Sequence, residues 1–259
     1  MLFAIDAGNQ YITIGGLDDT GETLFRCLIS TDKARTGDEY AVLFKNILDI
    51  RQISGRTVTG AIISSVVPSL TGVLRQAALM IAGRPPLMVG PGTKTGLNIL
   101  MENPGQMGGD IVSAAVAALN RYPLPCVTVD FGTATTIGVL DAKGNYIGGV
   151  ICPGVVVSLE GMNRTTSQLP GISLEAPGSV IGRETVECMQ SGIVYGFAAM
   201  FEGMMARIAE QLGETPTVVV TGESAGLILP QCRMEGAILD ENLALRGLWI
   251  IYQRNARKK

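Results

Sequence analysis

Short apolar runs rich in β-branched residues, separated by glycines, open the chain. Residues 2–5, 11–17 and 22–29 follow this pattern, which predicts three strands of a meander joined by tight turns. Apolar residues then recur at helical spacing over residues 38–50, after a Thr36-Gly37-Asp38 start that is typical of a helix N-terminus. The opening of the chain thus predicts an antiparallel sheet followed by a helix.

The rest of the first half alternates between the two kinds of pattern. It predicts a buried strand over residues 60–67, a helix over 70–82, a short strand at 87–89 and a helix over 110–121. Strands that alternate with helices indicate parallel pairing, so we expect this part to extend the sheet of the meander.

The second half again shows a hairpin pattern followed by helical and strand patterns, with longer elements. Its pattern predicts a hairpin sheet over residues 127–157, a long helix from about 184 to 212, a buried strand over 217–221 and a closing helix over 242–254.

One hairpin with a polar turn occurs twice. The segment LFAIDAGNQYITIGGLDDTG (residues 2–21) aligns with VTVDFGTATTIGVLDAKG (residues 127–144) after a one-residue gap. A single turn of this kind is most often an ordinary hairpin, but two copies half a chain apart indicate a duplicated domain. We therefore expect two domains, 1–124 and 125–259. In the alignment Asp6, Gly8 and Asn9 fall on Asp130, Gly132 and Thr133.

The residue types in these two turns suit phosphate binding. A glycine lets backbone N–H groups approach a phosphate closely, a threonine adds a hydroxyl, and a carboxylate such as Asp130 can hold a cation. Two such turns that face each other across a cleft would clamp the phosphates of a nucleotide.

Composition narrows the chemistry further. The chain has 259 residues, a net charge of −3 and no histidine, so only carboxylates, hydroxyls and backbone groups are available for catalysis. The sequence has no stripe of basic residues that would indicate nucleic acid binding. It also has no uninterrupted apolar run that would predict a membrane span. Five scattered cysteines without a CxxC pair, and Asp6 within the N-terminal apolar run, favour a cytoplasmic protein.

Two residues at predicted helix starts have alternative interpretations. Asp110 follows Gly108 and Gly109, and it is either a stabilising first-turn acid or the general base for a hydroxyl. Thr185 opens the long helix, where it either caps the helix or contacts a substrate.

The order of motifs resembles the type III pantothenate kinases, which belong to the superfamily of acetate and sugar kinases, heat-shock ATPases and actin. The resemblance runs from end to end, and it implies duplicated actin-like (ribonuclease H-like) α/β domains, each a mixed sheet with flanking helices around a central cleft. The matching segments are DAGNQ (6–10), TGDE (36–39), ISSVVP (63–68), NPGQMGGD (103–110), VDFGTATT (129–136), GNYIGGVICPG (144–154), SQLP (167–170), IGRET (181–185), SGI (191–193) and LALRGL (243–248).

The resemblance also implies a function, which is ATP-dependent phosphorylation of pantothenate to 4′-phosphopantothenate, the first step of coenzyme A biosynthesis. It implies a homodimer that uses ATP with Mg²⁺ and with K⁺ or NH₄⁺. Asp110 would be the proton acceptor and Asp130 the ligand of the monovalent cation. The ATP-binding residues would be Asp6, Ala7, Gly8, Asn9, Gln10, Tyr11, Ile12, Thr13 and Thr133, and the acceptor would be bound by Met101, Gly108, Gly109, Asp110, Ile111 and Thr185.

The chain departs from the family pattern mainly on the acceptor side. Ile111 stands where the family has an arginine, and Met101 stands where a tyrosine is common. An arginine bonded to a charged group is worth about 1.5–3 kcal/mol. Gln10 replaces a threonine in the first phosphate turn, and Glu223 lies in TGES (221–224), which replaces the TGG of the adenosine side.

These departures leave three hypotheses open. The first is a pantothenate kinase, and the second is a kinase of the same fold that acts on another small hydroxylated acceptor. The third is a non-catalytic paralogue that binds a ligand or a partner.

Overall fold

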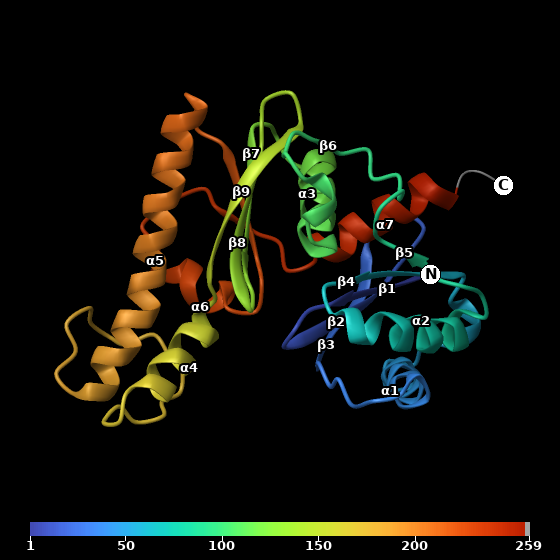
Figure 1. Cartoon of the computed structure of the whole chain (residues 1–259), viewed down its shortest axis with the longest axis horizontal. Coiled ribbons are helices and arrows are strands. Elements are labelled where there is room, and N and C mark those ends of the chain that lie inside the picture. Colours follow the sequence, from blue (N-terminus) through green and yellow to red (C-terminus); the bar gives the residue numbers. More distant parts are fainter. Residues whose placement is uncertain (257–259) are drawn as a thin grey trace. The chain divides into compact units, whose positions relative to one another are not determined.

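A computed structural model describes residues 1–256, which Figure 1 shows coloured from the N-terminus to the C-terminus. The chain forms two compact units. The first comprises Met1–Arg121 and the segment that begins at Asn242, and the second comprises Tyr122–Glu241. Helix α7 (Leu243–Ala256) therefore packs with the N-terminal half of the sequence, although it follows the C-terminal half along the chain.

The first unit is built on a mixed sheet with the strand order β3-β2-β1-β4-β5. Strand β1 pairs antiparallel with β2 and parallel with β4, so it joins the meander to the parallel part of the sheet. The strands are β1 (Leu2–Ala7), β2 (Tyr11–Leu17), β3 (Thr23–Ser30), β4 (Gly60–Ser65) and β5 (Leu87–Met88). The unit also contains α1 (Gly37–Ile50), α2 (Pro68–Ala82), α3 (Gly109–Arg121), the 3₁₀ turns Gly55–Thr57 and Pro104–Gln106, and the two-residue strand β6 (Asn98–Ile99).

The helices of the first unit cover both faces of this sheet. Phe3 and Ile5 of β1 pack in one apolar cluster with Phe44 of α1, which also contains residues of α2. Ala4 points to the opposite face and packs in a second cluster with Val116 of α3 and residues of α7. Because side chains alternate along a strand, even-numbered residues of β1 face α3 and α7.

The second unit has a mixed sheet in which β11, β10, β7, β8 and β9 follow one another in that order. Its apolar face is covered by the long helix α5, and Phe131 of β7 meets Phe201 of α5 edge to face, with ring centroids 5.8 Å apart. The elements are β7 (Cys126–Phe131), β8 (Ala134–Leu140), β9 (Asn145–Pro153), α4 (Val155–Thr165), α5 (Thr185–Leu212), β10 (Thr217–Thr221), α6 (Ala225–Ile228), the 3₁₀ turn Leu229–Gln231 and β11 (Ile238–Leu239).

Most elements that the hydrophobic pattern predicts are confirmed within a few residues. The range predicted for the hairpin sheet, residues 127–157, extends too far. Strand β9 stops at Pro153, and helix α4 begins at Val155. The three valines 155–157 have strand propensity, but Val155 and Leu159 are buried one helical turn apart. Tertiary burial therefore overrides the local preference. No helix among residues 1–256 is long and apolar enough to cross a membrane.

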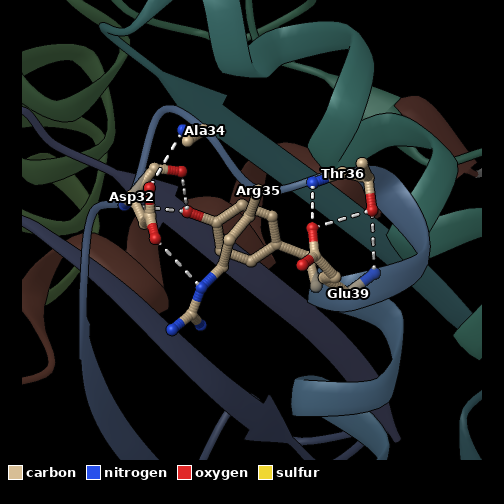
Figure 2. Close-up of polar contacts among 6 residues, drawn as sticks. Asp32, Ala34, Arg35, Thr36 and Glu39 are labelled. Atoms are coloured by element: carbon tan, nitrogen blue, oxygen red, sulfur yellow. Dashed lines mark hydrogen bonds and ion pairs between the residues drawn. The ribbon is translucent and has the colours of Figure 1, made fainter.

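The start of α1 shows how one of the short motifs acts locally. Figure 2 shows that Thr36 and Glu39 form a reciprocal capping box: the backbone N–H of Glu39 donates to Thr36 Oγ1 at 3.3 Å, and the backbone N–H of Thr36 donates to Glu39 Oε2 at 2.7 Å. Asp32 braces the preceding loop by pairing with Arg35 and accepting from the backbone of Ala34. The TGDE segment (36–39) is therefore a helix start signal.

The two sheets contain the duplicated hairpin in the same hydrogen-bonding frame. In the first unit Asp6 pairs with Thr13, and in the second Asp130 pairs with Thr136. The turn beyond each aspartate spans four residues in the first copy (8–11) and three in the second (132–134). The one-residue gap in the sequence alignment therefore lies in the turn, which confirms the repeat at the level of strand register.

The similarity continues to the far end of each hairpin. The register shifts at Gly16/Leu17 in one copy and at Val139/Leu140 in the other. Each copy then turns around an aspartate whose Oδ1 accepts two backbone N–H groups. Asp18 accepts from Thr20 and Glu22 at 2.8 and 3.0 Å, and Asp141 accepts from Lys143 and Asn145 at 2.9 and 2.8 Å. A repeat maintained down to single hydrogen bonds indicates duplication of the whole supersecondary unit.

These two aspartates predict how the stability of the fold responds to acid. At Asp18, hydrogen bonds from Thr20 and Glu22 lower the carboxyl pKa. At Asp141, burial opposes the charge, but hydrogen bonds from Asn145 and Lys143 outweigh it and lower the pKa. A lowered folded pKa gives stability that is present above the unfolded pKa of about 4 and is lost as the pH falls through the folded value.

We therefore expect the double variant Asp18→Asn and Asp141→Asn to unfold at lower urea concentration than the parent chain at about pH 6. The difference between the two proteins should shrink as the pH falls below about 4. Asp19→Asn, at an exposed neighbouring position, is the matched control. Equal sensitivity of the double variant and the parent at both pH values would contradict this assignment.

Candidate active site

The first phosphate turn is held by its own backbone and by the segment after β3. The N–H of Gly8 donates to the carbonyl of Tyr11 at 2.9 Å, and Thr31 Oγ1 donates to the carbonyl of Gly8 at 2.7 Å. The N–H of Thr31 also donates to the carbonyl of Gln10 at 2.9 Å. This bracing fixes the turn backbone before any ligand binds.

The eight residues expected at the ATP phosphates, 6–13, differ in what they can offer. The side chains of Ala7 and Ile12 are buried in the core that faces α1 and α2, so only their backbone groups are available. Asp6 is half-buried on the opposite face, and Asn9 is exposed in the turn. The structure thus presents Asp6, the turn backbone and the polar side chains of the turn as candidate ligand groups.

Asp110 lies in the first turn of α3, as the sequence predicts. Its Oδ1 accepts from the N–H of Ile111 at 2.8 Å. Burial raises the pKa of the Asp110 carboxyl, and the bonds from the backbone N–H groups of Ile111 and of Asp110 itself only partly offset that rise. A carboxylate with a raised pKa is a stronger base than an exposed aspartate.

The two glycines before Asp110 give it room. A Cβ on Gly108 would clash with Asp110 Oδ1, and a Cβ on Gly109 would lie 2.8 Å from Ser64 Oγ. Gly108 therefore accommodates the carboxylate, while Gly109 lets the helix start approach β4. These contacts explain why glycines precede the aspartate at this position.

A cavity of about 390 Å³ opens beside this helix start. Gly108 and Gly109 line it together with Ser65, Val66 and Thr93. A pocket of this size is suited to a small ligand. Asp110 itself is not among the residues that line it, although Gly109 before it and Val112 after it are.

The other residues predicted for the acceptor are placed differently. Met101 lies in the loop before the Pro104–Gln106 turn with 39% of its surface exposed, and Ile111 is half-buried in the first turn of α3. Thr185 is the exposed first residue of α5. The residue at the N-cap position is Glu184, which makes no side-chain capping bond, so Thr185 does not cap the helix.

The second phosphate turn lies at the end of β7. A Cβ on Gly222, which has φ +99°, would clash with Asp130 Oδ1, so the segment after β10 passes close to that carboxylate. A Cβ on Gly132 would lie 3.2 Å from Asp130 Oδ1 and 3.6 Å from Glu223 Oε2. Asp130 and Glu223 thus both approach the Gly132 turn, and Thr133 follows in the same turn.

The oxygen atoms in this turn have the chemistry that alkali cations need. Among residues 1–256, no group of three or more His, Cys, Asp or Glu side chains is placed to hold a metal ion. The candidate oxygen donors for a cation at this turn are the carboxylates of Asp130 and Glu223, which both approach Gly132, and the hydroxyl of Thr133. Oxygen donors with few charges suit weakly held hard cations.

Known proteins resemble this chain over nearly its whole length. A family profile described as type III pantothenate kinase matches residues 2–207. The type III pantothenate kinases of Anaeromyxobacter sp. (strain K) and Geobacter sulfurreducens are 43% and 42% identical to it over 256 residues. These matches cover 98% of this chain and 100% and 99% of the two relatives. The chain belongs to the type III pantothenate kinase family.

The fold comparison agrees with membership in the type III pantothenate kinase family. The activator of the 2-hydroxyisocaproyl-CoA dehydratase from Clostridium difficile, with bound ADPNP, has a TM-score of 0.53 at 10% identity. The match covers 100% of this chain and 98% of that one. This member of the type III pantothenate kinase family therefore has the duplicated actin-like α/β fold that its sequence predicts.

The sequence did not predict Ser64 as a residue of the site, although it lies within ISSVVP (63–68). Ser64 is fully buried, its hydroxyl has no hydrogen-bond partner, and it contacts the helix start that carries Asp110. Its only signal in the sequence is a polar residue inside an otherwise apolar strand.

The contact between Gly109 and Ser64 generates a stability prediction. Gly109→Ala should lower the free energy of unfolding by about 1–3 kcal/mol, because its Cβ would overlap Ser64 Oγ. Adding Ser64→Ala should recover part of this loss, since the same Cβ lies an acceptable 3.4 Å from Ser64 Cβ. Urea unfolding of the two single variants and the double variant measures the coupling.

Gly105→Ala is the matched control, because nothing lies within 4 Å of a Cβ placed there. We expect it to change the free energy of unfolding by less than about 0.5 kcal/mol. Strictly additive effects of Gly109→Ala and Ser64→Ala would show that the two residues do not constrain each other.

Proposed function

We propose that this chain transfers the γ-phosphoryl group of ATP to pantothenate and forms 4′-phosphopantothenate, the first step of coenzyme A biosynthesis. Family membership supports an ATP-dependent kinase. The observation that carries the proposal is the Asp110 carboxylate, which burial at the start of α3 makes more basic. The two glycines that precede it in the chain line a cavity large enough for a small ligand.

Asp110 acts as the proton acceptor in this proposal. The hydroxyl of pantothenate attacks the γ-phosphorus, the bond to the β–γ bridging oxygen breaks, and the hydroxyl proton passes to Asp110. Such a base typically contributes about 10²- to 10⁴-fold to the rate. Positioning and charge neutralisation around the phosphates account for most of the remaining acceleration.

The two hairpin turns provide the groups for ATP and its cations. Residues 6–13 and Thr133 would contact ATP, which binds together with Mg²⁺. Asp130 holds K⁺ or NH₄⁺. Support comes from the matched register of the two turns and from the hard oxygen donors at Asp130. Bound cations would neutralise charge on the phosphates.

The acceptor site contains Met101, Gly108, Gly109, Ile111 and Thr185. Gly108 and Gly109 line the cavity beside Asp110. Ile111 supplies no charge for the pantothenate carboxylate, and this observation favours a second candidate, a kinase of the same fold for a less anionic hydroxylated acceptor.

We also propose that the enzyme is a cytoplasmic homodimer, as the family resemblance implies. Its two sequence repeats, 1–124 and 125–259, would represent the duplicated domains, with α7 returning to pack on the first. The register match of the two hairpins supports the duplication.

The test is ATP consumption with Mg²⁺ and K⁺ present, measured with pantothenate, pantetheine and a panel of small alcohols and sugars. We expect turnover of pantothenate, and Asp110→Asn should lower kcat by at least about 10²-fold. Turnover of another acceptor alone would support the second candidate. No turnover and no ATP binding would leave a non-catalytic paralogue and overturn the proposal.

Asp110→Asn should also unfold at a higher temperature than the parent at pH values above the unfolded aspartate pKa of about 4. A raised carboxyl pKa means that the charged form is penalised in the folded state, and Asn removes that penalty while keeping an oxygen for the N–H of Ile111. For the same reason kcat of the parent should fall on the acid side as Asp110 becomes protonated. Lower stability of Asp110→Asn would contradict the pKa direction.

A further inference from the structure

Ser64 lies on β4, on the same face of the sheet as Asp6. It is the register partner of Asp6, because β4 pairs parallel with β1. Ile62, two residues earlier on β4, packs in the same apolar cluster as Val112 and Val116 of α3. Ser64 and Asp6 therefore lie side by side at the carboxyl ends of their strands, on the face that α3 covers.

The Ser64 hydroxyl is buried and makes no hydrogen bond. The residue has 0% of its surface exposed, and its Oγ is among the buried polar atoms that lack a hydrogen-bond partner. A buried donor left unsatisfied costs about 1–3 kcal/mol. An alanine would fit this position at lower cost, so stability alone does not account for the serine.

The hydroxyl faces the segment that positions the proposed base. Ser64 Oγ lies 2.8 Å from the site that a Cβ on Gly109 would occupy, and Asp110 is the next residue. The carbonyl of Gly109 is already engaged by Ser113 Oγ at 2.7 Å. Ser113, which is itself buried, thus ties the first turn of α3 to the next turn of the helix, while the Ser64 hydroxyl beside Gly109 has no partner.

The Ser64 hydroxyl has no partner in this structure, so the helix start has to move if it is to provide one. Hydrogen bonds in active sites are often long before ligands bind and tighten in the complex. A shift of the helix start toward β4 would bring its peptide groups closer to Ser64 Oγ, which already lies beside Gly109.

We propose that Ser64 is a positioning residue for Asp110: its hydroxyl hydrogen-bonds the first turn of α3 when ATP and the acceptor bind, and it thereby fixes the Asp110 carboxylate for proton transfer. This inference rests on the proposed kinase function. It assigns Ser64 no contact with the reacting atoms and gives Gly109 the role of keeping the helix start within reach.

The test compares Ser64→Ala with Ser64→Cys, which keeps a side chain of similar shape but bonds weakly through sulfur. We expect kcat to fall at least about tenfold in both variants, with KM for ATP and pantothenate changed by less than about threefold. The acid limb of the pH profile of kcat should move to higher pH, because losing a polar neighbour disfavours the charged carboxylate. Thermal unfolding midpoints of Ser64→Ala should be unchanged or raised.

Thr23→Val is the matched control. Thr23 Oγ1 is another buried hydroxyl without a partner in the same sheet, but it lies on β3 opposite Leu17, at the end of β2 remote from the phosphate turn. We expect kcat, KM and the pH profile of this variant to match those of the parent. A tenfold loss in Thr23→Val would show that removing any buried hydroxyl from the sheet is sufficient, and it would overturn the role of Ser64.

A second measurement does not depend on turnover. Amide hydrogen exchange at residues 109–112 should slow when the parent protein binds a non-hydrolysable ATP analogue with pantothenate, and this gain of protection should be absent in Ser64→Ala. Equal protection in both proteins, kcat of Ser64→Ala within about twofold of the parent, or restoration of kcat by cysteine would each overturn the proposal. Failure of the parent chain to phosphorylate pantothenate would instead count against the proposed function.

Discussion

The structure depends on one pairing arrangement, in which the first strand of a hairpin also pairs parallel with a later strand. In the first unit β1 lies between β2 and β4, and in the second β7 lies between β8 and β10. This places Asp6 and Asp130 at equivalent positions, each at the carboxyl end of a central strand and beside a tight turn. In both units the odd-numbered side chains of the central strand enter the apolar core, which leaves the aspartate on the other face. The positions of the two aspartates that we propose for ATP and its cation therefore follow from the strand register.

Close approach is the second constraint on the site. Gly108, Gly109 and Gly222 each lie where a Cβ would meet a neighbouring polar or backbone atom, and two of these neighbours are the carboxylates of Asp110 and Asp130. Burial near these carboxylates has a cost, which at Asp110 appears as a raised pKa. The same burial would strengthen Asp110 as the base that we propose, at a cost in stability that is common in active sites.

Most of the strands and helices and the repeated hairpin could be predicted from the sequence, because the signals that determine them are local. Apolar periodicity located the strands and helices, and the repeated Asp-x-Gly turns predicted the duplicated hairpin, whose register the structure confirms. The return of α7 to the first unit could not be read from periodicity, since it depends on packing against β1 and α3. Helix α4 was missed because its first residues are β-branched, and Ser64 was missed because its importance comes from a contact between β4 and Gly109 of α3.

The central claim is that the second copy of the hairpin binds the nucleotide together with a cation at Asp130. Calorimetric titration of Mg²⁺-ATP into the parent chain and into Asp130→Asn, with K⁺ and again with choline in its place, tests this claim directly. The account predicts that K⁺ strengthens ATP binding by the parent, and that Asp130→Asn binds ATP more weakly and without dependence on K⁺. Equal affinity and equal K⁺ dependence in the two proteins would contradict it.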